Sequence, residues 1–199
     1  MFILGLTGSI AMGKSTAAGM FKRLGCPVHD ADAAVHRLLG PQGAAVAAVV
    51  RLFPDAADAR GGVDRSKLGA LVFADAQALK KLESVLHPMV RRAEEAFLRQ
   101  ARTRRERLAV LDIPLLFETG AEVRCHATAM VTAPAFVQRA RALARPGMTL
   151  EKFARIRARQ MSETDKKGRA GWVLPTGLGK RFTLRRIQAL IGQIKGVAD

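Results

Sequence analysis

The stretch "GSIAMGKST", residues 8–16, constrains the fold more than any other part of this 199-residue chain. It fits the spacing G-x-x-x-x-G-K-[ST], which is typical of a loop that binds phosphate groups. The apolar run before it, residues 1–6, has the character of a buried parallel strand. Residues 15–24 place apolar side chains at helical spacing, and Gly25 suits the end of that helix. The flanks therefore predict strand, loop and helix, the context that the motif needs.

Each residue type in this loop has a chemical reason. Backbone N–H groups of the loop, together with the helix N-terminus, bind phosphate oxygens. Gly8 and Gly13 allow backbone angles and a close approach that a Cβ atom would block. Lys14 brings a positive charge to the β- and γ-phosphates, and the Ser15 hydroxyl can hold Mg²⁺. The motif therefore predicts a site for a nucleotide and Mg²⁺.

Strands alternate with helices along the chain, which predicts an α/β fold with a parallel sheet and helices on both of its faces. Ligands of such sheets bind at the carboxyl ends of the strands. Strands are expected within residues 1–6, 27–32, 108–118, 126–133 and 172–177. Helices are expected within residues 15–25, 32–53 with an interruption at 40–43, 65–107 with breaks near Ala74–Asp75 and at Pro88, 134–171 with a turn at Pro146–Gly147, and 180–196.

Composition narrows the class of protein. The chain is 49% apolar, and its two cysteines, Cys26 and Cys125, argue against a disulfide scaffold. No secretory leader and no uninterrupted apolar run of about 18 residues is recognisable, so we expect a cytoplasmic protein. The net charge of +16 is compatible with nucleic acid or with small polyanions. Because the basic residues are spread over several helices and tyrosine is absent, the small-anion interpretation is favoured.

Three aspartates follow predicted strands. Asp30 and Asp32 come after the second strand, and Asp112 ends the apolar run "LAVLD". At a phosphate site a carboxylate can take the proton of an attacking hydroxyl or help to hold Mg²⁺. The alternative is structural, because aspartate also caps helices and turns well. One of Asp30 and Asp32 could cap the next helix while the other acts in the site.

Three arginines, Arg139, Arg141 and Arg145, lie on the predicted helix before Pro146. Arg141 and Arg145 are four residues apart and share a helix face. A mobile helical lid that lowers arginines onto a transferred phosphate is typical of small kinases. A solvated charged face is the alternative, but the position between the fourth and fifth strands favours a lid.

Taken together, these pieces resemble the dephospho-CoA kinase family over almost the whole chain, and their order and gaps match. The resemblance implies a three-layer P-loop kinase fold, related to nucleoside monophosphate kinases, with a parallel central sheet, helices on both faces, a helical acceptor-binding insertion and a helical lid. It also implies transfer of the ATP γ-phosphate to the ribose 3′-hydroxyl of dephospho-CoA. The matching blocks are "GLTGSIAMGKST", "HDAD", "VDRSKLGALVF", "LHPMV", "DIPLLFE", "RARALARPGMT", "ARQM" and "WVLPTGLG".

The resemblance also implies roles for individual residues. Asp32 is the expected base, and Lys14 and Arg139 are expected to act on the transferred phosphate. The residues expected to bind ATP are Gly8, Ala11, Met12, Gly13, Lys14, Ser15, Thr16, Arg145, Thr176 and Gly177. Those expected to bind dephospho-CoA are Asp32, Arg65, His87, Pro114, Leu115 and Leu116. Ser15 and Asp112 are the expected Mg²⁺ ligands.

The chain departs from the family pattern at three places. Ala11 stands where many members have glycine, and Gly171 stands where an aspartate is usual. Pro175–Thr176 replaces a common asparagine near the adenine. The departures therefore concern the loop backbone and the recognition of the base, and they leave the residues of the phosphate chemistry in place.

The expected organisation is a single P-loop kinase unit over residues 1–199. Its core is expected at about 1–31, 107–135 and 170–199, its acceptor subdomain at about 32–106 and its lid at about 136–169. We expect a small-molecule substrate, no membrane contact, no nucleic-acid partner, and a monomer or weak oligomer. The alternatives are another small-molecule P-loop kinase and, from a different class, a nucleic-acid-binding P-loop ATPase, which the charge of +16 supports.

Overall fold

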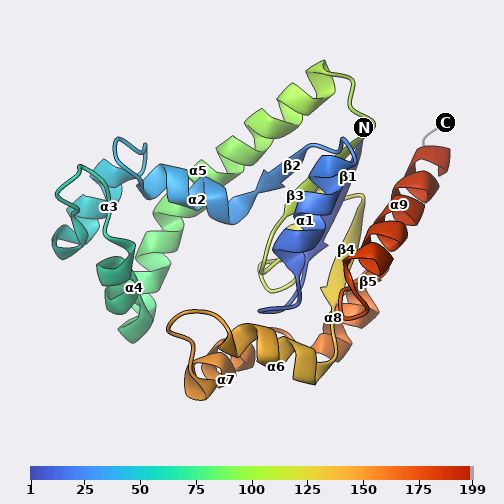
Figure 1. Cartoon of the computed structure of the whole chain (residues 1–199). Helices are drawn as coiled ribbons and strands as arrows, with labels where there is room; N and C mark the ends of the chain where they lie inside the picture. The colour runs from blue at the N-terminus through green and yellow to red at the C-terminus, as the bar shows by residue number, and fades with distance from the viewer. Residues whose placement is uncertain (198–199) are drawn as a thin grey trace. The chain divides into compact units, whose positions relative to one another are not determined.

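The computed structural model describes residues 1–197, with a five-stranded sheet at its centre (Figure 1). The strand order is β2-β3-β1-β4-β5. β1 pairs in parallel with both β3 and β4, and β4 pairs in parallel with β5, so the predicted α/β class is confirmed. The strand bounds are β1 Phe2–Thr7, β2 Val28–Asp30, β3 Leu108–Asp112, β4 Ala127–Thr132 and β5 Trp172–Pro175.

The helices follow the strands in the predicted order. Gly25 has φ 80° and ends the first of them in the left-handed conformation that glycine adopts without strain. The α-helices are α1 Lys14–Arg23, α2 Ala31–Leu39, α3 Val46–Leu52, α4 Arg65–Ala74, α5 Ala76–Thr103, α6 Ala135–Leu143, α7 Leu150–Ala158, α8 Glu163–Arg169 and α9 Lys180–Val197. Two short 3₁₀ helices are η1 Pro54–Ala56 and η2 Ala121–Arg124.

The chain divides into two compact units. Unit 1 comprises Met1–His29 and Gln100–Asp199, and unit 2 comprises Asp30–Arg99. Unit 2 is thus an insertion between two segments that build unit 1. The finer division into core, acceptor subdomain and lid stays a prediction.

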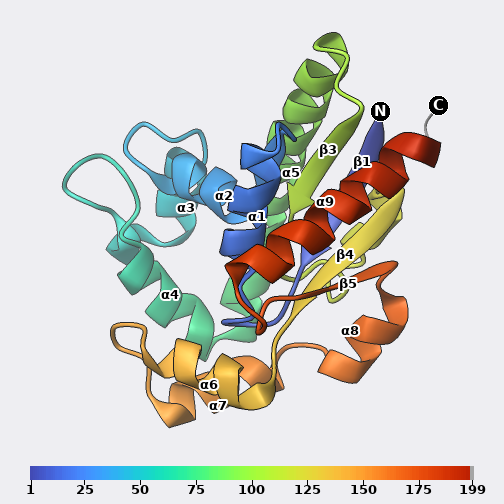
Figure 2. The same ribbon diagram turned by 45° about the vertical axis from the view of Figure 1, so that its right-hand side comes forward.

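Alternate strand residues build the main core of unit 1. Leu4 and Leu6 of β1, Val110 of β3 and Val131 of β4 are fully buried against α1 and α9. Because successive strand residues point to opposite faces, these positions share one face of the sheet. Figure 2 shows α9 lying along that face beside α1. The sheet thereby fixes where the loops at its carboxyl edge begin.

Unit 2 has a separate apolar core supplied by α2, α3, α4 and α5. α5 runs unbroken through Pro88, so the predicted helix break there is wrong. A proline removes one backbone hydrogen bond, but Leu82 and Leu86 before it are buried in this core, and Met89 after it packs on the same core. Burial on both sides of the proline holds the helix together, whereas the predicted break near Ala74–Asp75 is present between α4 and α5.

The chain after Pro146 forms two helices, α7 and α8, where a single one was predicted. Thr149 caps α7 by accepting the Lys152 N–H, as expected for a start at that residue. Ser162 caps α8 by accepting the Asp165 N–H at 3.1 Å. The serine therefore starts a new helix where periodicity alone suggested continuation.

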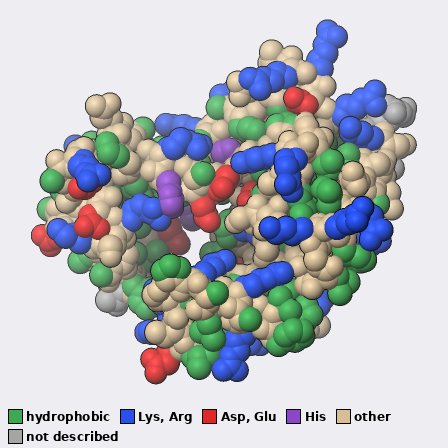
Figure 3. All heavy atoms as spheres, in the orientation of Figure 1, with side chains coloured by type: hydrophobic (Ala, Val, Ile, Leu, Met, Phe, Trp, Pro, Cys, Tyr) green, Lys and Arg blue, Asp and Glu red, His purple; other side chains and the backbone are tan. Residues whose placement is uncertain are grey.

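The surface is strongly basic, and in Figure 3 the lysine and arginine side chains lie in several groups on the face shown. Within residues 1–197, no helix has both the length and the apolar character needed to cross a lipid bilayer.

Candidate active site

The phosphate-binding motif forms the loop between β1 and α1. Gly8 packs against β4 so closely that an added Cβ would lie 2.3 Å from Val131 Cγ2. Gly13 is the residue before α1 and has φ 89°, a backbone conformation that residues with a side chain rarely adopt. Both glycines of the motif are therefore required by the backbone path. The loop ends at the N-terminus of α1, where free N–H groups can bind anions.

Ala11 lies in the same loop with φ 60°. This left-handed conformation is disfavoured for alanine and would be free of strain for glycine. The Ala11 side chain is buried in a small apolar cluster with Ala142 of α6 and Phe153 of α7. The residue with the strained backbone, Ala11, is therefore also a residue that packs against the predicted lid.

Lys14 and Asp112 form an ion pair with 2.6 Å between Nζ and Oδ1. The Asp112 side chain is only 3% exposed and that of Lys14 is 15% exposed. The pair connects the first residue of α1 with the last residue of β3, so the carboxyl edge of the sheet holds the lysine beside the loop. Ser15 and Thr16 follow on α1 and are exposed.

A cation at this edge would have few protein ligands. Within residues 1–197, no three acidic, histidine or cysteine side chains gather as a ready-made metal site. Mg²⁺ in kinases is typically held by one or two protein groups plus the substrate phosphates and water. The exposed Ser15 hydroxyl and the Asp112 carboxylate therefore fit a phosphate-bound Mg²⁺ and fit an all-protein metal cage poorly.

Thr176 lies in the loop after β5 and is 7% exposed. Its hydroxyl donates to the Met12 carbonyl at 2.6 Å, so the side chain holds the backbone of the phosphate-binding loop at Met12. Arg141 donates from Nη1 to the Thr176 hydroxyl at 3.1 Å and from Nη2 to the Thr176 carbonyl at 2.8 Å. Together these bonds join the loop, α6 and the segment after β5.

Arg141 was named with the lid helix but given no role in the site. The predicted roles went to Arg139, on the transferred phosphate, and to Arg145, in ATP binding. Arg139 lies on α6 and Arg145 follows α6, and both are exposed. The i,i+4 spacing of Arg141 and Arg145 was the available sequence signal. Of the three arginines, Arg141 is the one that binds Thr176, whose hydroxyl donates to the phosphate-binding loop at Met12.

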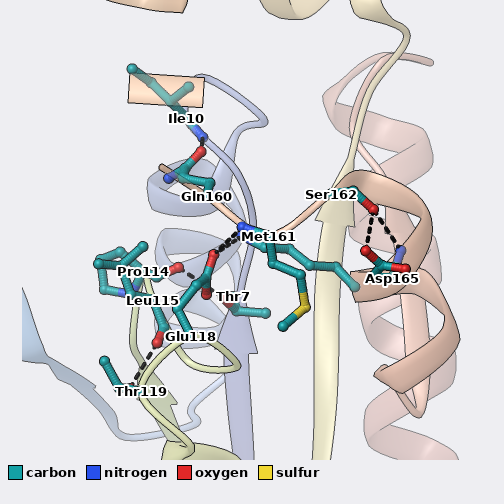
Figure 4. A network of polar contacts seen from close by, with 11 residues as sticks. Thr7, Ile10, Pro114, Leu115, Glu118, Thr119, Gln160, Met161, Ser162 and Asp165 are labelled. Atoms are coloured by element: carbon teal, nitrogen blue, oxygen red, sulfur yellow. Dashed lines mark hydrogen bonds and ion pairs between the residues drawn. The ribbon is translucent and has the colours of Figure 1, made fainter. Parts of the chain in front are cut away.

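The segment after β3 contains the predicted acceptor residues Pro114, Leu115 and Leu116. The Pro114 carbonyl accepts the Thr7 hydroxyl at 3.0 Å, which fixes the segment to β1 (Figure 4). Leu115 is 42% exposed, whereas Leu116 is fully buried and lies beneath Gly5. The Leu115 side chain is therefore available at the surface, and the Leu116 side chain belongs to the core.

Glu118, at the end of the same segment, connects it to the base of the predicted lid. Its Oε1 atom accepts the Met161 N–H at 3.0 Å (Figure 4) and lies 2.8 Å from Lys166 Nζ. The Lys166 side chain is completely buried. Glu118 thus holds both the turn before α8 and α8 itself.

Five further residues of interest lie in unit 2. Asp30 caps α2 by accepting the Ala33 N–H at 2.9 Å, so it fills the structural role considered for this pair. Asp32 lies in the first turn of α2 and is exposed. His36 lies on α2, one helical turn after Asp32, and its Nδ1 atom is 3.1 Å from Nη1 of Arg65. His36 was missed, although its i,i+4 spacing from Asp32 places both on one face. The predicted His87 is exposed on α5, next to Pro88.

A family model described as dephospho-CoA kinase matches residues 2–178. The chain belongs to the dephospho-CoA kinase family. Dephospho-CoA kinase of Rhodospirillum rubrum is 56% identical over 94% of this chain and 89% of that protein. Dephospho-CoA kinase of Paramagnetospirillum magneticum is 57% identical over 98% of this chain and 92% of that protein. Membership makes the chain an ATP-dependent kinase, as the sequence predicted.

Solved structures show the same fold. A crystal structure from Thermus thermophilus has a TM-score of 0.83 and 40% identity, covering 96% of this chain and 97% of the other. Dephospho-CoA kinase from Campylobacter jejuni has a TM-score of 0.64 at 22% identity, covering 96% of both chains, and supports the fold. The predicted P-loop kinase fold is confirmed, and nothing in these comparisons favours the alternative kinase or the nucleic-acid-binding ATPase.

Proposed function

We propose that this member of the dephospho-CoA kinase family transfers the γ-phosphate of ATP to the ribose 3′-hydroxyl of dephospho-CoA, with Mg²⁺ as cofactor. The observation that carries the proposal is the Lys14–Asp112 pair, which fixes a lysine beside a phosphate-binding loop at the carboxyl edge of the sheet. The relatives named dephospho-CoA kinase, which match 94% and 98% of this chain, support dephospho-CoA as the acceptor.

Residues 11–16 are the proposed binding site for the ATP phosphates. The backbone N–H groups of the loop and of the first turn of α1 neutralise the phosphate oxygens. Lys14 stabilises the negative charge that spreads over the phosphoryl group during transfer. Mg²⁺, held by Ser15 and Asp112, would neutralise further phosphate charge when bound.

Asp32 is the proposed general base, which accepts the proton of the acceptor hydroxyl. Two observations support it over Asp30. The Asp30 carboxylate is used by the N-cap of α2, and the Asp32 carboxylate is exposed on the first turn. Arg65 and His36 lie together in the same unit, so a cationic group is available there for an anionic acceptor.

The remaining role assignments follow the same family pattern. Arg139 and Arg145 are proposed to reach the transferred phosphate when the lid, α6 to α8, closes and excludes water. Pro114, Leu115 and His87 are proposed to bind the acceptor, with the buried Leu116 side chain holding their loop in place. Gly177 and Thr176 are proposed to adjoin the adenine. A monomer or weak oligomer in the cytoplasm is the proposed state.

The decisive experiment measures phosphoryl transfer from ATP to dephospho-CoA, adenosine and AMP in parallel, with and without Mg²⁺. Asp32→Asn removes the base, and Asp30→Asn is the matched control, because asparagine also caps helices well. We expect transfer to dephospho-CoA to fall about 10²–10⁴-fold in Asp32→Asn, the usual contribution of a general base. Asp30→Asn should keep wild-type activity.

Two results would contradict the proposal. Equal rates for Asp32→Asn and wild type would remove Asp32 as the base. No transfer to any acceptor, together with ATP hydrolysis stimulated by DNA or RNA, would favour a nucleic-acid-dependent ATPase and give the positive charge its explanation.

A further inference from the structure

Two glutamines from the predicted lid bind the phosphate-binding loop at one residue. The Ile10 N–H donates to Gln160 Oε1 at 3.0 Å (Figure 4), and Gln138 Nε2 donates to the Ile10 carbonyl at 2.9 Å. Gln138 lies on α6 and is 4% exposed, and Gln160 lies between α7 and α8. The peptide groups on both sides of Ile10 are therefore fixed by side chains 128 and 150 residues away in sequence.

These contacts lie directly before the strained position of the loop. The Ile10 carbonyl belongs to the peptide that leads into Ala11, whose φ is 60°. An alanine released from its contacts favours negative φ, whereas glycine adopts either sign about equally. Fixing the Ile10–Ala11 peptide therefore restricts Ala11 to the conformation that the loop requires.

Beside the hydrogen bonds, Ile10 and Met148 pack on the buried cluster that contains Ala11. A cavity of about 610 Å³ adjoins the loop, lined among others by Ser9, Met12, Gln138 and Gln160. Atoms that face a cavity lack the dispersion contacts of a close-packed interior. Two glutamine hydrogen bonds and the small apolar cluster of Ala11, Ala142 and Phe153 therefore both connect the loop with α6 and α7.

We propose that Gln138 and Gln160 are positioning residues, which act as a clamp that holds the alanine-containing loop in its phosphate-binding conformation. The clamp makes ATP affinity depend on the segment that carries the lid helices. If only a fraction of molecules has the competent loop, the apparent dissociation constant for ATP rises by the inverse of that fraction. The inference rests on the proposed function only in taking ATP as the ligand of the loop.

The test is a double-mutant cycle with Gln138→Leu, Gln160→Leu and Ala11→Gly. The dissociation constant for ATP is measured by calorimetry without acceptor, and KM, kcat and the urea midpoint are measured alongside. Gln193→Leu is the matched control, because it removes a glutamine that accepts a hydrogen bond from the Trp172 indole, far along the sequence from the loop. The control should leave ATP binding unchanged.

In the wild-type background we expect each clamp variant to raise the ATP dissociation constant about tenfold, which equals about 1.4 kcal/mol. KM for ATP should rise with it while kcat stays within about twofold. In the Ala11→Gly background the same variants should raise the constant about threefold or less, because glycine does not need to be held. Such non-additivity is the signature of coupling between the clamp and residue 11.

Equal fold losses in both backgrounds, or a lower urea midpoint with unchanged ATP binding, would overturn the clamp and leave the glutamines as ordinary stabilising residues. A wild-type protein that binds ATP without phosphorylating dephospho-CoA would refute the proposed acceptor, and the cycle would still decide on the clamp. A wild-type protein that does not bind ATP would overturn both.

Discussion

Replacing Thr176 by valine tests whether its buried hydroxyl supports the phosphate-binding loop. Valine keeps the shape and removes the donor to the Met12 carbonyl at 2.6 Å and the acceptor for Arg141 at 3.1 Å. Met12 is 3% exposed, so its carbonyl would be left unpaired in the interior. Losing the bond and burying an unpaired acceptor together predict a loss of about 2 kcal/mol in the free energy of unfolding.

For a chain of this size, that loss corresponds to a fall of about 4–8 °C in the thermal midpoint. Thr176→Ser is the matched control, since it keeps the hydroxyl and removes one methyl group, worth about 0.8 kcal/mol. Calorimetric unfolding of the wild type and both variants gives the comparison. If valine and serine lower the midpoint equally, the hydroxyl has no supporting role and the reasoning fails.

Two further results are expected. Lys14→Ala should abolish transfer and lower the free energy of unfolding, measured by urea titration, by about 3 kcal/mol, because the buried Asp112 carboxylate loses this cation. Adding Asp112→Asn should recover part of the stability but no activity. Burial, opposed by the charge of Lys195 and reinforced by that of Glu106, raises the pKa of the Cys26 thiol above its ordinary 9.0. Iodoacetamide should therefore modify Cys26 slowly in the folded protein at pH 8 and quickly in urea, and stability should fall as the pH rises above 9, less so in Cys26→Ala. Fast modification without urea, or a pH dependence shared by Cys26→Ala, would contradict this.

Local patterns predicted the framework of the protein well. The strand–loop–helix around Lys14 follows from spacing over a few residues, and the stop at Gly25 and the cap at Thr149 are local preferences of single residue types. The same local logic failed at Pro88, because the burial of neighbouring leucines decides whether that helix continues. It also missed the start of α8 at Ser162, where the cap competed with helical periodicity.

The contacts of the site were harder to predict, because they join distant segments. Arg141 binds Thr176 across 35 residues, and its i,i+4 spacing from Arg145 was the local signal that set it apart from Arg139. The family pattern predicts Thr176 beside the adenine, and no local signal indicates that its hydroxyl also donates to the Met12 carbonyl. Which side chain of a loop faces the ligand depends on packing that the sequence pattern does not encode.

The order of the strands has a consequence for how the protein is synthesised. β1 leaves the ribosome before β3 and β4, yet Phe2 pairs with Leu108 and Leu4 pairs with Ala127, so its partners appear only after unit 2 is complete. Unit 2 is one continuous stretch, and its contacts can form earlier. Pairing between distant residues is slow, and a single unpaired strand is prone to aggregate. We therefore expect the nascent chain to need protection of its first strand until β3 and β4 have emerged.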